Sequence, residues 1–303
     1  MVSGSRELAV YTTVYPGVEK FLPDWYASLR SQTDQDFDLW VGLDGLTPKE
    51  AGALMGGEPD VRWAPSQAGD TPATVRERAF EQIVSRHGSV VFVDSDDVLL
   101  PDRVAAARAA LEASDVAGCA LHVVDEDARD TGVIFGTPPG TDWADFLPRY
   151  NVFGMSNTAY RSETLARCLP VPPAGRLVDW LLAMRASLLG ARLSFDAVPR
   201  MKYRQYSGNV ARMLPPFRAE DIVSAADRVA THHAGLLDTA WSVPPAKRPR
   251  LEAERERVES FRTRMRASEG LLEDYVHELG LLPARPVWWW CVAHPELEWM
   301  WNN

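Results

Sequence analysis

The stretch Ser89-Val-Val-Phe-Val-Asp-Ser-Asp-Asp-Val-Leu-Leu100 decides the fold of this chain. It opens on a short run of apolar, mostly β-branched residues, which is the pattern of a buried strand. The run leads directly into three carboxylates, Asp94, Asp96 and Asp97. Ligands of open α/β sheets bind where the strands end, so the carboxylates mark a candidate site.

The same change from strand to polar turn recurs on both sides of this stretch. Short apolar runs predict strands, and stretches with helical spacing of apolar residues alternate with them. The strands are expected over 8–14, 37–43 and 61–63, and the helices over 19–31, 48–55, 72–86 and 101–113. This alternation predicts an α/β, Rossmann-like fold whose central sheet is mostly parallel and flanked by helices.

The second part of the chain is less regular. Strands are expected over 116–124 and 132–136, an extended segment over 151–160, a helix over 176–189 and two short strands within 192–206. Pro215-Pro216 marks a boundary. We therefore predict a domain over 1–215 and an added C-terminal helical module over 216–303, with helices over 218–237 and 248–280.

The C-terminal module carries a large apolar area. Leu251, Val258, Met265, Leu272 and Leu279 repeat every seven residues, and five tryptophans follow within 288–301. Soluble monomers rarely expose so much apolar surface, so we expect a homodimer through the long helix or the tryptophans. Two alternatives stay open. The module folds back on its own domain beside the acceptor cleft, or its tryptophans meet a lipid-linked acceptor or a membrane face.

Composition excludes several classes of protein. The 303 residues carry a formal net charge of −10, which argues against a nucleic-acid partner. The three cysteines are far apart and form no CxxC motif, so no disulfide framework or zinc ribbon is predicted. The sequence shows neither an apolar leader nor a run long enough for a transmembrane segment, so a cytoplasmic location is expected. The pair His232-His233 is interpreted as solvated rather than metal-binding.

Four ordered pieces of sequence carry a resemblance to a known family. They are Thr13-Val-Tyr15 with the helix after it, Asp44-Gly45, residues 92–103 around the carboxylates, and Val178-Asp179-Trp180 with Tyr203-Arg-Gln-Tyr206. In this order they resemble the family 2 glycosyltransferases of the GT-A fold, over roughly residues 7 to 210.

The resemblance implies a function and a role for each matching residue. The function is metal-dependent, inverting transfer of a hexosyl group from a nucleotide sugar, expected to be a UDP-sugar, to the hydroxyl group of a saccharide or other small molecule. Residues 1–113 would be the nucleotide-binding half and residues 114–215 the acceptor half. The implied nucleotide-sugar contacts are Thr13, Tyr15, Asp44, Arg76, Asp96 and Arg204; Asp97 would bind Mn²⁺ or Mg²⁺, and Asp179 would be the general base.

Elementary chemistry agrees with these roles. A leaving diphosphate is stabilised by a divalent cation, and oxygen ligands suit that cation. A half-buried carboxylate such as Asp179 deprotonates an attacking hydroxyl group. Asp179 alternatively serves only to favour a helix N-terminus. Arg76 and Arg204 equally suit ion pairs within the protein.

The sequence departs from the family pattern at four positions. Leu43 replaces an acidic residue of the second turn, Val178 an acidic residue before the base, Tyr206 a frequent histidine, and Pro16 an asparagine. These changes predict an unusual substrate, but they leave Asp97 and Asp179 in place.

Two other functions remain open at this stage. A catalytically silent protein of the same fold would bind a partner through its helical tail. A sugar nucleotidyltransferase would also place acidic metal ligands on such a sheet, but it should have a glycine-rich loop after the first strand. Residues 12–17 contain one glycine, which ranks this alternative last.

Overall fold

The computed structural model describes residues 6–57, 59–237 and 241–302, and the first residues searched for a leader lie outside this part. One nine-stranded sheet runs through it. Its strands are β1 (Leu8–Val14), β2 (Phe37–Leu43), β3 (Arg62–Pro65), β4 (Ser89–Phe92), β5 (Val98–Leu99), β6 (Val116–Val124), β7 (Asp130–Phe135), β8 (Thr158–Arg161) and β9 (Leu193–Arg204).

The strand order is β3-β2-β1-β4-β8-β6-β9-β5, with β7 paired to β6. Strands β3, β2, β1 and β4 are mutually parallel, as the βαβ pattern predicts. Strand β8 then joins β4 to β6 with antiparallel pairings on both sides. The predicted α/β architecture is therefore confirmed.

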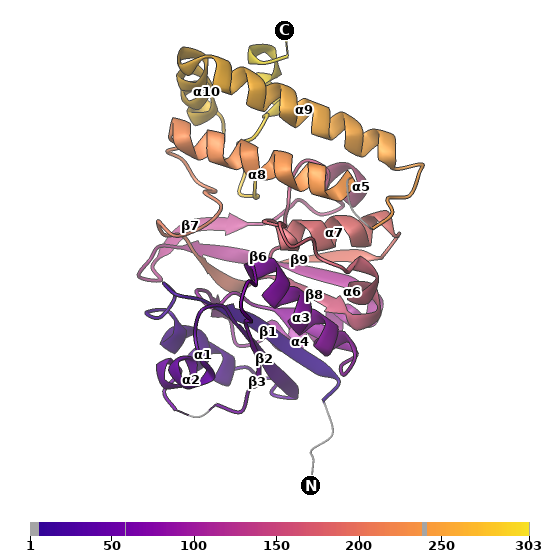
Figure 1. Ribbon diagram of the computed structural model, residues 1–303. Coiled ribbons are helices and arrows are strands. Elements are labelled where there is room, and N and C mark those ends of the chain that lie inside the picture. Colours follow the sequence, from indigo (N-terminus) through magenta and orange to yellow (C-terminus); the bar gives the residue numbers. More distant parts are fainter. Residues whose placement is uncertain (1–5, 58, 238–240, 303) are drawn as a thin grey trace.

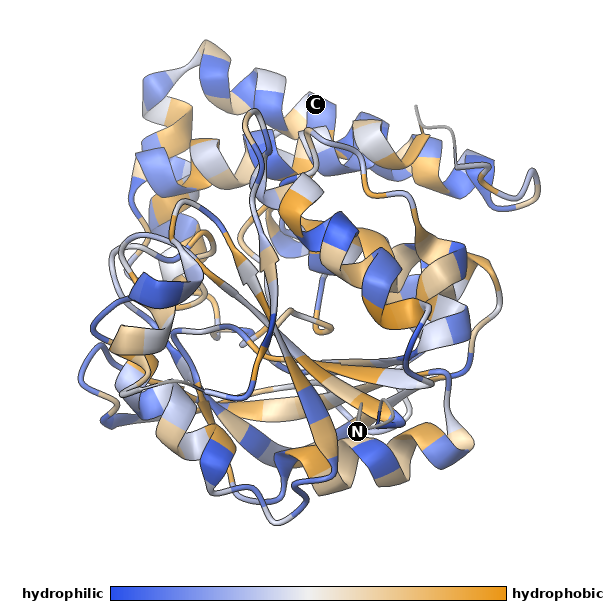
Figure 2. Cartoon of the chain, turned by 60° about the horizontal axis from the view of Figure 1, so that its bottom comes forward, coloured by the Kyte–Doolittle hydropathy of each residue, from blue (hydrophilic) through white to orange (hydrophobic). Residues whose placement is uncertain are grey.

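Helices flank the sheet and form a separate layer at the C-terminal end (Figure 1). They are α1 (Leu22–Arg30), α2 (Pro48–Leu54), α3 (Pro72–Val84), α4 (Arg103–Ala113), α5 (Trp143–Phe146), α6 (Ser162–Cys168), α7 (Val178–Leu188), α8 (Ala219–Leu237), α9 (Arg248–Ala267) and α10 (Glu269–Leu281), followed by a 3₁₀ turn (Pro295–Met300). In Figure 2 hydrophobic residues predominate on the central strands, whereas hydrophilic and hydrophobic residues alternate along the helices.

Three sequence expectations are corrected in the second half. Residues 193–204 form one strand rather than two, with register shifts against β6 near Ala120. Only Thr158–Arg161 of the expected extended segment is a strand. The helix expected over 248–280 is two helices, because Ser268 has extended backbone dihedrals and its side chain accepts a hydrogen bond from Leu271 N.

The C-terminal module folds back on its own domain. All five residues of the seven-residue stripe are buried within the single chain. Glu254 on α9 accepts a hydrogen bond from Arg149 Nε at 2.9 Å, which ties α9 to the segment before β8. The apolar area that argued for a dimer is therefore largely covered by the chain itself. In the described residues, every helix is too short or too polar to cross a membrane.

Residues Trp288–Trp290, named here the tryptophan segment, lie between α8 and the main domain. The Trp288 ring packs 4.1 Å from the Phe135 ring and against Gly154, where an added Cβ would lie 2.4 Å from Trp288 Cη2. Trp290 Nε1 donates to Met213 O at 2.7 Å. The segment thus belongs to the core that joins the module to the sheet.

The interpretation of His232-His233 as solvated is wrong. Both side chains are buried on the inner face of α8. The His232 ring stacks on the Trp180 ring with centroids 4.3 Å apart. Burial lowers the pKa of both imidazoles, that of His233 to about 4, so the pair is neutral at pH 7.

Candidate active site

The site is built around residues Asp94–Asp97, named here the acidic turn, which follow β4. Carboxylate oxygens of Asp94, Asp96 and Asp97 all lie within 4.8 Å of one another. The turn is anchored to β1, because Ser95 Oγ donates to Thr13 O at 2.8 Å. The parallel part of the sheet therefore presents three carboxylates at the carboxyl end of β4.

The acidic turn is buried despite its charge. The exposed fraction is 7% for Asp96 and 1% for Asp97. Burial, with the neighbouring carboxylates adding to it, raises the pKa of Asp96 to about 6 and that of Asp97 well above its usual range. Converging carboxylates of this kind fit a hard divalent cation, which binds oxygen ligands and offsets their repulsion.

Two hydrogen-bond donors hold the Asp97 carboxylate in place. The backbone N–H of Arg204 donates to Oδ1 at 2.8 Å, and the Ser156 hydroxyl group donates to Oδ2. Ser156 Oγ also lies 3.0 Å from Asp94 Oδ2. A hydroxyl group has one proton, so Ser156 donates to one of the two carboxylates at a time. Ser156 was not predicted from the sequence, because the residues around it form no motif that indicates a site.

The Arg204 side chain is hydrogen-bonded to the backbone of the acidic turn. Its Nε donates to Asp96 O at 2.9 Å and its Nη1 to Glu126 O at 2.6 Å. Nη2 lies 3.4 Å from Asp24 Oδ2. All three nitrogens of this buried guanidinium group have protein partners, so a direct nucleotide-sugar contact by Arg204 stays a prediction.

Tyr206 reaches the acidic turn although it departs from the family pattern. Its hydroxyl group donates to Asp96 Oδ2 at 2.9 Å. The Tyr15 side chain is hydrogen-bonded to Tyr206, and burial together with Asp96 raises the pKa of Tyr15. Two tyrosines from distant parts of the sequence thus lie beside one carboxylate.

Thr13 and Asp44 lie at the ends of neighbouring strands. Val14 of β1 pairs with Leu43 of β2, and Asp44 N donates to Val14 O at 2.9 Å. Asp44 is half-buried, whereas Thr13 is buried with its Oγ1 3.0 Å from Tyr11 Oη. The structure therefore brings both predicted nucleotide contacts to the edge that carries the acidic turn.

Arg76 lies on α3 and contributes a positive charge to the site. Its Nε is buried and has no hydrogen-bond partner among the described residues. The positive charge of Arg76 lowers the pKa of both Asp94 and Asp179 against the effect of burial. The guanidinium group therefore lies near both carboxylates and keeps donor capacity for an anionic group.

Asp179 is the second residue of α7 and is half-buried. Its Oδ2 accepts a hydrogen bond from Asn151 Nδ2 at 2.8 Å. Burial raises the pKa of Asp179 to about 6, and the negative charge of Asp94 contributes to the increase. The carboxylate is thus ionised at pH 7 and retains affinity for a proton, as a general base requires.

Asn151 links this carboxylate to the tryptophan segment. Its side chain is fully buried, and Oδ1 accepts from Phe153 N at 3.0 Å. Its backbone pairs with Trp288 in both directions, at 3.3 and 3.2 Å. The one available signal was a single polar residue in the apolar stretch Tyr150-Asn-Val-Phe153, which sequence reasoning did not use.

The structure therefore groups the predicted residues in three places. Asp96, Asp97, Tyr15, Arg76 and Asp179 surround one region at the end of β4. Thr13 and Asp44 lie beside it, at the ends of β1 and β2. Arg204 contacts the backbone of the acidic turn through Asp96 O.

Comparisons with known proteins identify the fold of the chain. No family model and no curated protein matches the sequence. Among solved structures, S. aureus TarS residues 1–349 in complex with UDP-GlcNAc has a TM-score of 0.56 at 18% identity, covering 91% of this chain and 79% of that one. The mannosyltransferase PcManGT from Pyrobaculum calidifontis, in complex with GDP-Man and Mn²⁺, has a TM-score of 0.55 at 16% identity, covering 93% and 78%.

Because both identities are low, these likenesses show the fold alone. The chain has the GT-A fold that the sequence analysis expects, with a C-terminal helical addition.

Proposed function

We propose that this protein is a family 2-like, inverting hexosyltransferase that moves a sugar from a UDP-sugar to a hydroxyl acceptor. The observation that carries the proposal is the meeting of the acidic turn, Arg76 and Asp179 at the end of β4. Both solved structures named above hold a nucleotide sugar, and one also holds Mn²⁺.

The acidic turn supplies the ligands for a divalent ion. Asp97 would hold Mn²⁺ or Mg²⁺, and Asp96 would face the ribose and the donor sugar. Such an ion, when bound, neutralises the negative charge that develops on a departing diphosphate. Arg76 would face the same anion, because its Nε keeps a free donor among the described residues.

Asp179 would accept the proton of the acceptor hydroxyl group. The hydroxyl oxygen attacks the anomeric carbon, the bond from that carbon to the diphosphate oxygen breaks, and the proton passes to the Asp179 carboxylate. A single displacement of this kind inverts the anomeric centre. Asn151 holds the carboxylate through Oδ2, which leaves lone pairs of Oδ1 for the proton.

Thr13, Tyr15 and Asp44 would recognise the nucleoside. The Asp44 carboxylate is an acceptor that fits the N3–H of uracil, and its half-buried position leaves it accessible to a base. This is the reason for proposing a UDP-sugar as the donor, and a GDP-sugar is the direct competitor in any test.

Calorimetric titration of the full chain with UDP and with GDP, each with and without Mn²⁺, tests the proposal. We expect UDP to bind tightly only with the metal, and Asp97→Asn to abolish the metal dependence. Asp60→Asn, a change at an exposed carboxylate, is the matched control. Equal UDP binding by wild type and Asp97→Asn would falsify the metal assignment, and preference for GDP would overturn the donor.

A homodimer is also part of the proposal. The stripe and four of the five C-terminal tryptophans are buried, while Trp299 is 61% exposed. The burial of the stripe equally weakens the alternative of a silent protein that binds a partner through its tail. Light scattering at micromolar concentration distinguishes dimer from monomer, and a monomer would end the dimer proposal.

A further inference from the structure

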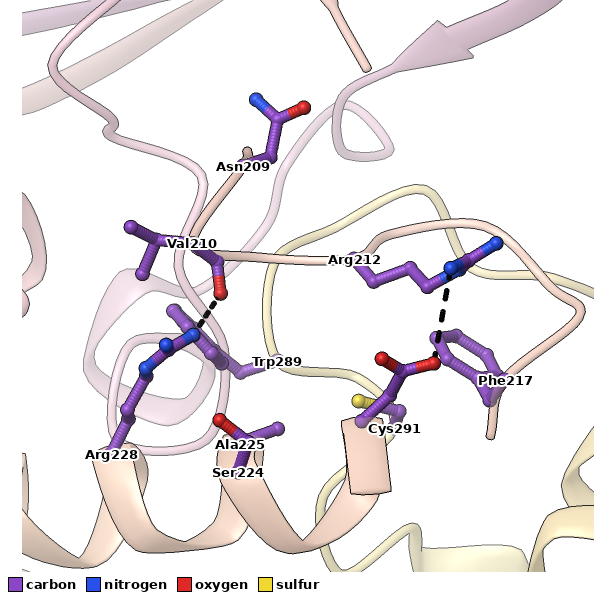
Figure 3. Close-up of a pocket in the computed structure, with 10 residues that line it drawn as sticks. Asn209, Val210, Arg212, Phe217, Ser224, Ala225, Arg228, Trp289 and Cys291 are labelled. Carbon is purple, nitrogen blue, oxygen red and sulfur yellow. Dashed lines mark hydrogen bonds and ion pairs between the residues drawn. The ribbon is translucent and has the colours of Figure 1, made fainter. Parts of the chain in front are cut away.

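A pocket of about 160 Å³ lies where the segment after β9 meets α8 and the tryptophan segment. Its lining includes Arg212, Asp221, Arg228, Trp289 and Cys291. Figure 3 shows Arg228 rising from α8 and Arg212 coming from the segment after β9, with Trp289 between them in the view. The pocket is large enough for a small polar group with its first waters.

Positive charge in the pocket is incompletely balanced. Arg212 Nη1 lies 3.9 Å from Asp221 Oδ2, at the limit of an ion pair, and Asp221 already accepts two hydrogen bonds from the Arg218 side chain. Arg228 donates to the backbone oxygen of Val210 rather than to a carboxylate. Burial, with the positive charge of Arg176 adding to it, lowers the pKa of Arg228.

Two chains of contact connect the pocket to the candidate active site. Trp289 follows Trp288, whose backbone pairs with Asn151, the donor to Asp179. On the opposite wall, Asn209 Oδ1 accepts from Tyr206 N at 2.5 Å, and Tyr206 donates to Asp96.

A further link is electrostatic: the positive charge of Arg176, which lies three residues before Asp179 in the chain, lowers the pKa of Arg228. The pocket is therefore attached to the elements that hold the proposed base and to those that hold the donor-sugar carboxylate.

We infer that this pocket is an acceptor subsite that binds an anionic group, a phosphate or a carboxylate, carried by the acceptor molecule. The inference rests on the proposed function and adds a substrate class to it. Arg212 and Arg228 lie on two walls of the pocket, with their guanidinium groups apart in Figure 3, and each offers planar donors that suit such oxyanions. The Trp289 ring supplies an apolar wall, which suits the carbon skeleton that carries the anion.

The test is calorimetric titration of the metal-free full chain with glucose 6-phosphate, glucuronate and glucose. We expect the two anions to bind and neutral glucose not to bind. Whichever of the two binds more tightly identifies the anion as phosphate or carboxylate. Arg228→Gln and Arg212→Gln should each weaken anion binding by about tenfold or more, the effect of one lost charge-assisted hydrogen bond. Arg129→Gln, a change on the exposed turn between β6 and β7, should bind as wild type.

Two results would overturn the inference. One is the absence of anion binding to the wild-type chain at millimolar concentration. The other is loss of binding in Arg76→Gln with full binding in Arg228→Gln, because the anion then occupies the proposed donor site. Circular dichroism melting confirms that each variant is folded. UDP with Mn²⁺ is titrated in parallel, so a failure of the pocket and a failure of the proposed function give different results.

Discussion

The acidic turn and the tryptophan segment are both buried, but burial of the two has opposite effects on the stability of the folded chain. The turn holds three carboxylates whose pKa values are all raised by burial, and the neighbouring carboxylates add to the increase for Asp96 and Asp97. The tryptophan segment holds three large apolar side chains with exposed fractions of 5% or less. The first destabilises the folded chain in the absence of a cation, and the second stabilises it. Changes in the two regions should therefore separate activity from stability.

Asp179→Asn should have the largest effect, and that effect should fall on activity alone. The amide keeps the shape but accepts no proton, so turnover should fall by about 10² to 10⁴. Binding of UDP and the melting temperature should stay near those of the wild type, since the change removes a carboxylate whose burial is unfavourable. Steady-state kinetics with calorimetry measure both. Full turnover in the variant would assign Asp179 a structural role.

Trp290→Ala should show the opposite behaviour. Its side chain is 1% exposed and packs on Phe217, so truncation should lower the free energy of unfolding by about 3–5 kcal/mol. Activity per folded molecule should change much less. Urea unfolding followed by circular dichroism measures the loss. Trp299→Ala, at an exposed position, is the matched control and should change stability by less than about 1 kcal/mol.

The buried histidine pair links stability to pH. The pKa of His233 is about 4 in the folded chain and near 6.5 in the unfolded one, so the unfolded chain binds more protons between these values. The stability that neutral His233 contributes is therefore lost as pH falls from about 6.5 to about 4. For His233 alone we expect a loss of about 2 kcal/mol at pH 5 relative to pH 8, which the raised pKa values of Asp96 and Asp179 partly offset in the whole chain. Urea unfolding at both pH values should show a smaller difference in His233→Phe, and an equal difference would contradict this account.

Asn151→Ala should give the smallest change, located where the two regions meet. The Asn151 amide donates to the ionised Asp179, so its removal should raise the pKa of Asp179 above about 6. The acid limb of the kcat/KM profile should move to higher pH by roughly half to one unit, the size of one hydrogen bond. Turnover at pH 8 should change little, and Asn151→Asp should move the limb further. A profile identical to that of the wild type would make Asn151 purely structural.

The sequence predicted the first half of the fold well, because strands such as β4 and turns such as Asp94–Asp97 are marked by local patterns. It predicted less of the site. Ser156, Asn151 and Tyr206 act through partners 59, 28 and 110 residues away, and local patterns do not encode such pairings. The break at Ser268 had a local signal, a serine followed by a glutamate, which the seven-residue stripe concealed.

The pairing of Asn151 with Trp288 also has a consequence for the order of assembly. The residue that orients the proposed base is held by a segment synthesised 137 residues later. During translation the sheet strands and the acidic turn leave the ribosome well before this segment does. The growing chain thus has the proposed metal ligands early, but Asn151 is held beside the proposed base only after the tryptophan segment has been made and has docked. Synthesis and docking of the tryptophan segment, rather than sheet formation, would then complete the proposed site.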